Sequence, residues 1–371
     1  MKAVVLVGGE GTRLRPLTYT TPKPLLPIAN VAFLERQLEW LASYGVDEVV
    51  LSMGYLPDAF HAHFPDDRFG SVRLRYAVEE KPLGTAGGIR FAAEGINERF
   101  IVCNGDVLTA LDLGAMLQFH EARGADASIY LCRVDDPSSF GVVPTRADGE
   151  VVGFIEKPPR DQAPTDWINA GTYVLEPSVI ERIPARMNVS IERETFPRMV
   201  VNRGSLYAYQ DDGYWLDMGT PQKYLQAHLD ILAGALGPSP VRSAKESITA
   251  PGVWIQDGAR AADDARIEAP VLLGPGSQVG SGATVAQSVL GAGAVVADGA
   301  RVIRSVLLPG ARVEAGSEVI DSVLGAGSVL GAGGVVADVS IVGAAVDIPA
   351  GTRISGGRVP SEEPVAGRAN L

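Results

Sequence analysis

The carboxyl-terminal third of the chain repeats itself, and this repetition limits the possible folds more than any other feature. Apolar or small residues recur every six positions, at Ile255, Ala261, Ile267, Leu273, Val279 and Val285. Longer units of nearly equal length follow, each opening with Ser-Val-Leu, over Ser288–Arg304, Ser305–Asp321 and Ser322–Val339. A period of about 18 residues built from sixes predicts a triangular coil, with three short strands per turn and one inward side chain per face. An irregular β-sandwich is the alternative.

The part of the chain from Met1 to Leu236 follows a different pattern, in which strand-like and helix-like stretches alternate. The stretch Ala32–Ser43 places Leu34, Leu38 and Leu41 on one helical face, and Gly45 follows as a stop signal. Buried strands are predicted over Ala3–Val7, Glu48–Met53, Val72–Val78 and Phe100–Cys103. Such alternation predicts a Rossmann-like α/β domain, with a mostly parallel sheet covered by helices and ligands gathering at the carboxyl ends of its strands.

The change of pattern suggests where the domains divide. We expect the α/β domain over residues 1–237, a linker marked by Pro238–Pro240 over 238–252, the coil over 253–357 and a tail over 358–371. The coil resembles the left-handed β-helix of hexapeptide-repeat proteins. Some coils of this kind carry acetyltransferase sites, which typically need a histidine base. The histidines of this chain are His61, His63, His120 and His228, and all lie outside the repeats. We therefore interpret the coil as serving assembly or regulation, and its open ends predict a homo-oligomer.

Charge and cysteine content narrow the possible partners and the compartment. The formal net charge is −12, which argues against nucleic acid or an acidic membrane surface as a partner. Two cysteines cannot build a disulfide framework, and no run of residues approaches the length of a transmembrane helix. We therefore expect a cytoplasmic protein. The stretch Met1–Asn30 is locally basic, because its one acidic residue, Glu10, is outnumbered by Lys2, Arg13, Arg15 and Lys23. It could bind a small polyanion.

A glycine-rich loop, Gly8–Leu17, directly follows the first predicted strand. Its glycines let backbone N–H groups approach phosphate oxygens, and Arg13 offers a planar fork to a phosphate. The loop lacks the Gly-Lys-Ser/Thr ending of a Walker loop, and Leu14 replaces the third glycine of a dinucleotide fingerprint. Thr21–Pro27 then stiffens the chain around Lys23 with prolines, which suits holding a charge in place. A plain turn and a proline-rich surface loop are the alternatives.

Together these two stretches, GGEGTRLRPLT and PKPLLP, resemble the signature of the nucleotidyltransferases that make nucleotide sugars. Further matches follow in the family's order, at Pro82–Gly88, Asn104–Asp106, Phe140–Val143, Glu156–Pro158, Asn169–Gly171 and Tyr214–Thr220. A β-helix tail also agrees with several members of this family. The resemblance implies that a sugar 1-phosphate attacks the α-phosphorus of a nucleoside triphosphate and that pyrophosphate leaves.

The resemblance also implies roles for individual residues. The expected nucleotide-binding residues are Leu6, Gly8, Gly9, Gly11, Thr12, Arg13, Lys23, Glu79, Pro82, Gly84, Thr85 and Asp106. The expected sugar-phosphate-binding residues are Gly141, Glu156, Lys157, Asn169 and Gly171. Arg13 and Lys23 would neutralise the departing pyrophosphate, and Lys157 would hold the incoming phosphate.

Two aspartates are expected to hold Mg²⁺, the one cofactor that the sequence implies. Asp106 follows the predicted strand Phe100–Cys103 at its carboxyl end, as a magnesium ligand should, although a turn aspartate is the alternative. Asp217 lies far away in sequence and would supply the second carboxylate, the alternative being a surface acid beside Trp215. The catalytic set is therefore Arg13, Lys23, Asp106, Lys157 and Asp217.

The identity of the nucleotide base and of the sugar is predicted from a smaller set of residues. The resemblance implies that Glu79–Thr85 reads the base. A carboxylate accepts both the N1–H and the 2-amino group of guanine, so Glu79 favours GTP, with Glu80 as the fallback and an exposed acid pair before a proline turn as the alternative. Ser190–Pro197 is similar to a segment of the branch that transfers guanylyl groups to mannose 1-phosphate. Other readings are thymidylyl or uridylyl transfer to glucose 1-phosphate, and a non-catalytic regulatory subunit. The intact spacing from Gly8 to Arg13 and the presence of both aspartates disfavour the last.

Overall fold

The computed structural model describes residues 1–201, 205–237, 241, 243–248 and 250–362. The predicted linker tripeptide Pro238–Pro240 and the end of the predicted tail lie outside the described residues. The chain forms two compact units. The first, here called the α/β unit, comprises Met1–Gly9 and Leu34–Trp215. The second, the coil unit, comprises Glu10–Phe33 and the described residues from Leu216 onward, so the segment that carries Arg13 and Lys23 groups with the repeats.

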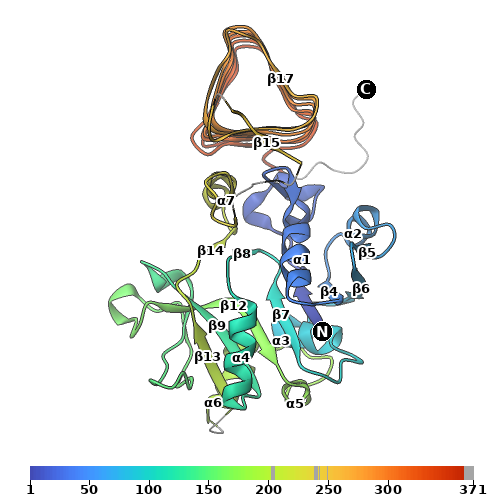
Figure 1. Cartoon of the computed structure of the whole chain (residues 1–371), viewed down its shortest axis with the longest axis vertical. Coiled ribbons are helices and arrows are strands. Elements are labelled where there is room, and N and C mark those ends of the chain that lie inside the picture. The colour runs from blue at the N-terminus through green and yellow to red at the C-terminus, as the bar shows by residue number, and fades with distance from the viewer. Residues whose placement is uncertain (202–204, 238–240, 242, 249, 363–371) are drawn as a thin grey trace. The chain divides into compact units, whose positions relative to one another are not determined.

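The α/β unit is built on one mixed sheet with the strand order β11-β10-β12-β7-β1-β4-β6-β5, and β9 and β13 extend it from β12 (Figure 1). Its strands are β1 (Lys2–Leu6), β4 (Glu48–Met53), β5 (Arg68–Phe69), β6 (Val72–Val78), β7 (Phe100–Asn104), β8 (Val107–Thr109), β9 (Ala127–Arg133), β10 (Gly141–Val142), β11 (Ile155–Glu156), β12 (Trp167–Leu175) and β13 (Leu206–Gln210). Its helices are α1 (Phe33–Ser43), α2 (Pro57–His63), α3 (Gly84–Ala92), α4 (Leu113–Arg123), α5 (Pro177–Glu181) and α6 (Phe196–Val201). The four strands and the helix predicted from periodicity are confirmed within one residue at each end.

Strand register brings several predicted site residues to one edge of this sheet. β1 pairs in parallel with β4 and β7, so Leu6 lies between Ser52 and Asn104. β12 runs antiparallel to β7, and its amino-terminal half therefore reaches the edge where β7 ends. The pairing of β12 with β9 shifts register between Asn169 and Tyr173, which is a β-bulge. The carboxyl edge of the parallel strands thus meets a bulged strand that re-aims its side chains.

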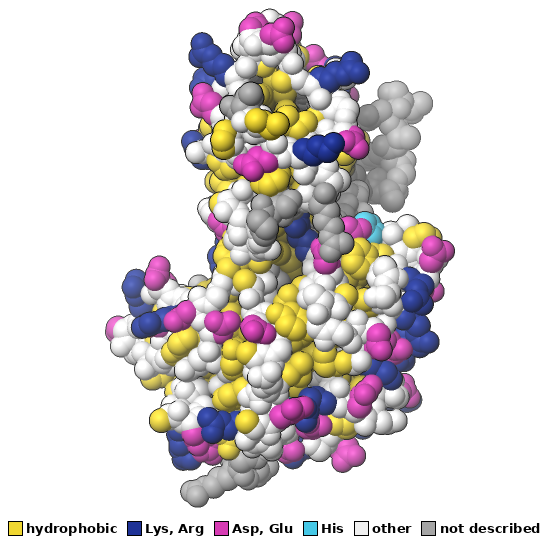
Figure 2. Space-filling model, in the orientation of Figure 1, with side chains coloured by type: hydrophobic (Ala, Val, Ile, Leu, Met, Phe, Trp, Pro, Cys, Tyr) yellow, Lys and Arg dark blue, Asp and Glu magenta, His cyan; other side chains and the backbone are white. Residues whose placement is uncertain are grey.

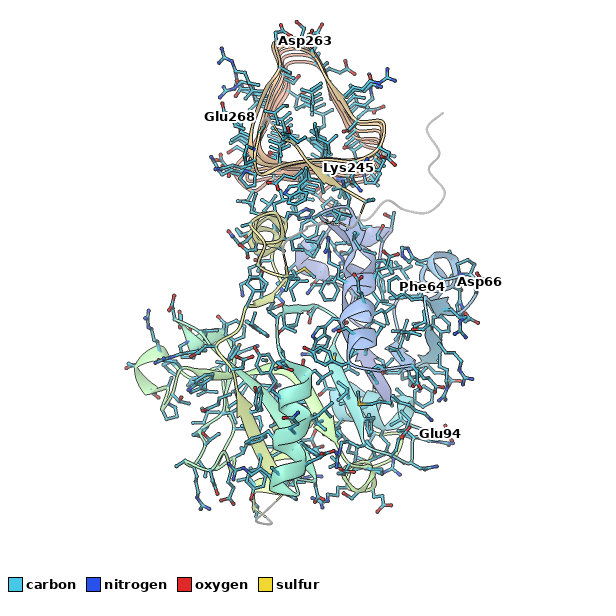
Figure 3. The ribbon with its side chains drawn as sticks, in the orientation of Figure 1. Phe64, Asp66, Glu94, Lys245, Asp263 and Glu268 are labelled. Carbon is cyan, nitrogen blue, oxygen red and sulfur yellow. The ribbon has the colours of Figure 1, made fainter. Side chains whose placement is uncertain are left out.

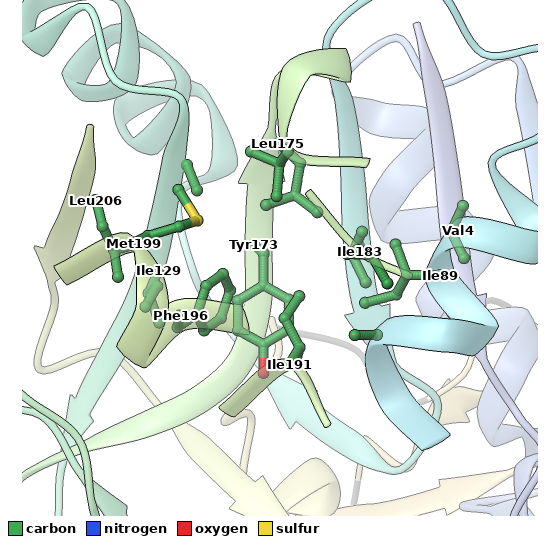
Figure 4. Packing of buried hydrophobic residues seen from close by; sticks show 14 of the residues in the cluster. Val4, Ile89, Ile129, Tyr173, Leu175, Ile183, Ile191, Phe196, Met199 and Leu206 are labelled. Atoms are coloured by element: carbon green, nitrogen blue, oxygen red, sulfur yellow. The ribbon is translucent and has the colours of Figure 1, made fainter. Parts of the chain in front are cut away.

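Burial of apolar side chains on both sides of the sheet explains why these segments pack. Leu34, Leu38 and Leu41 of α1 are fully buried, as the helical periodicity predicts. The main core cluster includes Tyr173 of β12, which packs edge-on against Phe196 of α6 with ring centroids 5.2 Å apart (Figure 4). This aromatic contact fixes β12 beneath the segment that precedes α6.

The coil unit consists of a triangular stack of parallel strands, together with a hairpin and one long helix (Figure 1). The hairpin is formed by β2 (Pro27–Ile28) and β3 (Val31–Ala32), β14 is Trp215–Asp217, and the helix is α7 (Pro221–Leu232). The stack contains β15 (Lys245–Glu246), β16 (Val253–Ile255), β17 (Arg260–Ala261), β18 (Arg266–Leu273), β19 (Gln278–Val279), β20 (Thr284–Leu290), β21 (Val295–Val296), β22 (Arg301–Ile303), β23 (Val306–Leu307), β24 (Arg312–Val313), β25 (Glu318–Ile320), β26 (Val323–Leu324), β27 (Val329–Leu330), β28 (Val335–Ala337), β29 (Ile341–Val342), β30 (Asp347–Ile348), β31 (Arg353–Ser355) and β32 (Arg358–Val359).

Each turn of the coil lies directly on the previous one. Arg301 pairs with Glu318, and Val335 pairs with Arg353, so the partners in each pair are one repeat apart along the chain. From β16 onward the pairs are parallel, whereas β15 adds to β16 in the antiparallel sense. The predicted triangular coil is confirmed, and its parallel stacking is that of a left-handed β-helix.

A column of buried serines runs through one corner of the coil. The N–H of Ser305 donates to the hydroxyl of Ser288 at 3.1 Å, and Ser322 and Ser340 continue the column with the same contact. Each hydroxyl also donates to a carbonyl of its own turn, as Ser305 does to Ile303. The serine that opens each Ser-Val-Leu repeat therefore supplies hydrogen-bond partners for buried backbone groups at its corner of the coil.

In the described part of the chain, the first turn of the coil is covered only by the short antiparallel strand β15. Leu273, Val279 and Val285 point inward and are buried, as the six-residue spacing predicts. Ile255 occupies the equivalent position one turn earlier and is 37% exposed, because among the described residues only Lys245 of β15 pairs with it on that side. Figure 2 shows hydrophobic side chains at this end, whereas the charged Asp263 and Glu268 point away from the coil in Figure 3.

Within the described part of the chain, no helix is long and apolar enough to cross a membrane.

Candidate active site

A pocket of about 310 Å³ collects most of the residues predicted to bind the sugar phosphate. It lies in the α/β unit, and Gly141, Glu156, Lys157 and Asn169 are all on its wall. The fifth predicted residue, Gly171, is beside it, and its N–H donates to the Asn169 side-chain oxygen at 3.1 Å. The other lining residues, for which the sequence analysis predicted no role in the site, are Ser139, Phe140, Ser190, Glu192 and Arg193.

Two very short strands assemble one side of this pocket. β10 pairs with β11 so that Gly141 lies opposite Glu156. The N–H of Lys157 then donates to the carbonyl of Phe140 at 3.0 Å. Lys157 has a φ of 50°, in the left-handed region that a long side chain rarely adopts. Strain of this kind is stored where the position of a side chain matters, which agrees with a functional role for this lysine.

Glu156 contacts two cationic side chains that line the pocket. Its Oε1 lies 3.6 Å from the Lys157 ammonium and accepts from the Arg193 guanidinium at 3.2 Å. The Lys157 side chain is 58% exposed, so its charge stays available to an incoming ligand. A pocket lined by a lysine, an arginine, an amide and carboxyl groups suits a phosphorylated polyol.

A chain of hydrogen bonds connects this pocket with the predicted nucleotide-binding turn. The Asn169 amide donates to the Tyr173 hydroxyl at 2.8 Å, and that hydroxyl donates to Glu192 Oε1 at 3.3 Å. Glu192 Oε2 accepts from the hydroxyls of Thr85 and Ser190, each at 2.9 Å. Burial and then the Glu192 charge raise the pKa of Tyr173 well above its usual value, so this hydroxyl remains a donor.

The predicted base-reading residue braces the turn between β6 and α3. Glu79 Oε2 accepts from the Leu83 N–H at 2.8 Å, and its Oε1 accepts from the Ser52 hydroxyl at 3.1 Å. The carboxylate is half-buried, whereas Glu80 is exposed. The turn itself is fixed to a remote segment, since the Ala86 N–H donates to the carbonyl of Val189 at 2.9 Å. Pro82, Gly84 and Thr85 therefore lie on a turn that the Glu79 carboxylate helps to close.

The carboxyl edge of the central strands carries the first predicted magnesium ligand. Asp106 is half-buried and follows β7 after Gly105, whose N–H donates to the carbonyl of Leu6 at 2.9 Å. That contact ties the end of β7 to the end of β1, just before Gly8 and Gly9. Asp106 therefore stands two residues beyond the end of β7, and its role as a magnesium ligand stays a prediction.

The remaining predicted nucleotide residues belong to the coil unit. Gly11 has a φ of 62°, and its carbonyl accepts from the Thr18 hydroxyl at 3.0 Å, which closes the loop that carries Thr12 and Arg13. Arg13 is exposed, while Lys23 opens a short helical turn and is only 8% exposed. The two cationic side chains predicted to bind phosphate thus differ strongly in their exposure to solvent.

Arg13 packs against the segment that contains the second predicted magnesium ligand. A Cβ built on Gly219 would overlap the Arg13 guanidinium, so a larger residue there would displace that side chain. Gly219 comes two residues after the half-buried Asp217. Within the coil unit, the Arg13 guanidinium therefore lies beside a residue that is close in sequence to Asp217.

Comparison with known proteins identifies the family. Residues 2–234 match the family model described as nucleotidyl transferase. The chain is also 42% identical over 289 residues to the mannose-1-phosphate guanylyltransferase of Mycobacterium tuberculosis, a match that covers 77% of this chain and 79% of that protein. The chain belongs to the nucleotidyl transferase family.

Further similarities extend this assignment. Residues 267–366 match the model described as GMPPB C-terminal domain. Mannose-1-phosphate guanylyltransferase 1 of Arabidopsis thaliana is 43% identical over 241 residues, which is 62% of this chain and 66% of that protein. Among solved structures, HddC from Yersinia pseudotuberculosis, in complex with GMP-PN, is 32% identical with a TM-score of 0.53, covering 61% of this chain and 97% of that one. Similarity to known proteins is thus found both in sequence and in structure.

Proposed function

We propose that this protein is a mannose-1-phosphate guanylyltransferase, which converts GTP and mannose 1-phosphate into GDP-mannose and pyrophosphate. The observation that carries the proposal is the 42% identity to the Mycobacterium tuberculosis enzyme over 77% of this chain. The structure of HddC with GMP-PN, at 32% identity, supports a guanine nucleotide. The sugar-phosphate pocket supports the other substrate.

The reaction that the site has to promote is a displacement at phosphorus. A phosphate oxygen of mannose 1-phosphate forms a bond to the α-phosphorus of GTP, and the bond from that phosphorus to the β-phosphate bridging oxygen breaks. The electron pair of the broken bond leaves with pyrophosphate. The attacking oxygen is already ionised, so the chemistry needs alignment and positive charge rather than a general base.

The proposed roles divide between the two units. In the α/β unit, Lys157 holds the phosphate of the sugar while Asn169 and Glu156 contact its hydroxyls, since these groups line one pocket. In the coil unit, Arg13 and Lys23 stabilise the charge on the departing pyrophosphate. The turn that Glu79 braces receives the base. The carboxylate of Glu79 accepts hydrogen bonds from the base with the lone pairs that its contacts inside the protein leave available.

Mg²⁺ is the cofactor that we propose for this site. Asp106 and Asp217 are half-buried carboxylates, and carboxylate oxygens are the ligands that this ion prefers. Among the described residues no group of three or more His, Cys, Asp or Glu side chains forms a metal cluster, and a nucleotide-bound magnesium ion needs only one or two carboxylates beside phosphates and water. When bound, the ion supplies positive charge that offsets the repulsion between the two polyanions.

A pyrophosphate-release assay over several nucleotides and sugar phosphates tests the proposal. We expect GTP with mannose 1-phosphate to give the highest kcat/KM, with activity that requires Mg²⁺. A preference for dTTP or UTP with glucose 1-phosphate would replace the proposal with thymidylyl or uridylyl transfer. Absence of turnover with every pair would indicate a regulatory subunit.

We propose in addition that the protein forms a homo-oligomer through its coil. The first turn supports this, because Ile255 remains 37% exposed beside the short strand β15 and would be buried against a second copy. Light scattering on the full-length chain provides the test, and a monodisperse monomer would contradict the proposal.

A further inference from the structure

The segment with the predicted phosphate cations is supported by the repeats rather than by the sheet. Residues Glu10–Phe33 carry Arg13 and Lys23 and belong to the same compact unit as the coil. Their last third folds into the β2–β3 hairpin, in which Pro27 pairs with Ala32 and Ile28 with Val31. What fixes this hairpin therefore also fixes the short helical turn that Lys23 opens.

The tip of the hairpin is strained. Its two central residues, Ala29 and Asn30, have φ angles of 45° and 62°, as a two-residue turn of this kind requires. Asparagine tolerates the left-handed region, but alanine has no side-chain hydrogen bond to compensate for it. Such a turn persists where surrounding contacts impose it.

Those contacts come from the first turns of the coil and from α7. The Asn30 side-chain amide donates to the carbonyl of Leu290 at 2.9 Å and to Gln256 Oε1 at 3.0 Å. The Ala29 N–H donates to the buried His228 Nδ1 at 3.1 Å, and the Tyr224 hydroxyl donates to the carbonyl of Pro27 at 2.6 Å. Both sides of the hairpin tip are therefore held by residues that lie far along the chain.

The receiving surface leaves little freedom. Gln256 is 6% exposed, and its own amide donates to the Ser243 hydroxyl at 2.7 Å, which fixes which of its atoms faces Asn30. A Cβ on Gly274 would stand 2.8 Å from the Asn30 amide nitrogen. Since Asn30 supplies two donors to two acceptors in matched positions, the contact is specific to an amide side chain.

We infer that the coil is a working part of the active site and that Asn30 is the residue through which it acts. Asn30 is a positioning residue: it ties the hairpin to the coil, and thereby holds Lys23 and Arg13 where the triphosphate is bound. This inference rests on the proposed function for the identity of the substrates. The assembly role that the sequence suggested for the coil is then accompanied by a direct role in catalysis.

The test combines kinetics with hydrogen–deuterium exchange on the full-length protein. For Asn30→Ala we expect kcat with saturating mannose 1-phosphate to fall about tenfold, from the loss of two neutral hydrogen bonds, with the KM for mannose 1-phosphate changed by less than about twofold. Backbone amides of residues 10–33 should exchange faster, whereas those of the α/β unit should keep their parental rates. Asn30→Asp should be more damaging, because a carboxylate would face two acceptor oxygens.

Two further variants provide the controls. Asn97→Ala removes the same side chain from an exposed loop and should leave both readouts unchanged. Gln256→Ala removes one partner without altering the hairpin sequence, so it tests the contact even if Asn30 variants fold poorly. Combined with Asn30→Ala, it should add little to the single defect, since both changes break the same contact.

The outcomes separate this inference from the proposed function. Parental kcat and parental exchange of residues 10–33 in both Asn30→Ala and Gln256→Ala would overturn the inference while leaving guanylyltransferase activity established. A parent that prefers another nucleotide or sugar would overturn the proposed function, and the exchange experiment, which needs no substrate, would still decide whether Asn30 holds the segment.

Discussion

The sugar-phosphate pocket and the phosphate-binding segment obtain their rigidity in opposite ways. The pocket is made of strands of one sheet and of the turn Ser190–Arg193, whose contacts lie inside the α/β unit. The segment Glu10–Phe33 is made of short helical turns and a hairpin, and its tip is held by partners 199, 226 and 260 residues away. The pocket therefore supports itself, whereas the segment depends on a remote part of the chain.

The lysines of the two regions show the same contrast. Lys157 is more than half exposed and stands on a strained backbone beside a carboxylate. Lys23 is buried to 8% exposure and is flanked by prolines. We therefore expect Lys157 to move toward a substrate that enters and leaves, and Lys23 to be placed in advance for charge that develops during the reaction.

The largest effect is expected from the two aspartates, of which Asp106 belongs to the α/β unit and Asp217 to the coil unit. Asp106→Asn and Asp217→Asn should each lower kcat by about 10³-fold or more, because both carboxylates are proposed to hold the magnesium ion that aligns the phosphates. Steady-state rates over a magnesium titration measure this. If one variant keeps a near-parental rate with unchanged magnesium dependence, that aspartate is not a metal ligand.

The lysines should separate the two regions kinetically. Lys23→Ala should lower kcat by about 10²–10³-fold, the range found when one charge-stabilising donor is removed. Lys157→Ala should mainly raise the KM for mannose 1-phosphate, because its exposed ammonium is proposed to bind the ground state of that substrate. Initial rates in both reaction directions distinguish the two patterns. Identical kinetic defects would contradict the separate roles.

Base choice tests the turn that Glu79 closes. GTP should be preferred over ITP, which lacks the 2-amino group, by about ten- to a hundredfold, equivalent to one charge-assisted hydrogen bond. Glu79→Gln should reduce this preference and let UTP and dTTP compete, whereas Glu80→Gln should have less effect. The measurement is kcat/KM for the four nucleotides. Should Glu80 prove to be the sensitive residue, only the choice between these neighbours is wrong.

The smallest effect is expected where the pocket meets the nucleotide-binding turn. Glu192→Gln should raise the KM for mannose 1-phosphate about tenfold, since three hydroxyl donors lose a charged acceptor. Glu194→Gln is the matched control, because Glu194 accepts from the Ser190 N–H on the same turn but does not line the pocket. Equal defects in both variants would mean that Glu192 only stabilises the turn.

Much of the self-supporting region could be predicted from sequence because its signals are local. A strand followed by Asn-Gly-Asp placed Asp106, and Glu156–Pro158 and Asn169–Gly171 supplied residues that the pocket brings together. Glu192 and Arg193 lie in Ser190–Pro197, whose similarity to the mannose branch predicts no role for either residue in the pocket. Their place on the pocket wall depends on how a π-helical turn over Ile191–Thr195 packs on β12, and no short pattern encodes that.

The dependent region was harder to predict for the same reason. The period of the coil follows directly from its serines and spaced apolar residues. The Asn30 contact does not, because the turn Ala29–Asn30 lacks the Asn-Gly pair that usually marks a hairpin, and its partner Leu290 is 260 residues distant. Segment 10–33 precedes most of the α/β unit in the chain, so sequence order alone assigned it to that domain.

The distance between Asn30 and Leu290 also sets an order of events during synthesis. The amino-terminal segment leaves the ribosome first, but the carbonyl that receives its asparagine is made 260 residues later, which takes about 10–50 s at ordinary rates of translation. Most of the sheet is made before any of these partners; α7 then supplies the first of them, Gln256 follows, and Leu290 completes the docking surface last. A truncated or nascent chain therefore lacks a fully supported phosphate-binding segment, and full turnover begins only when the first turns of the coil have been added.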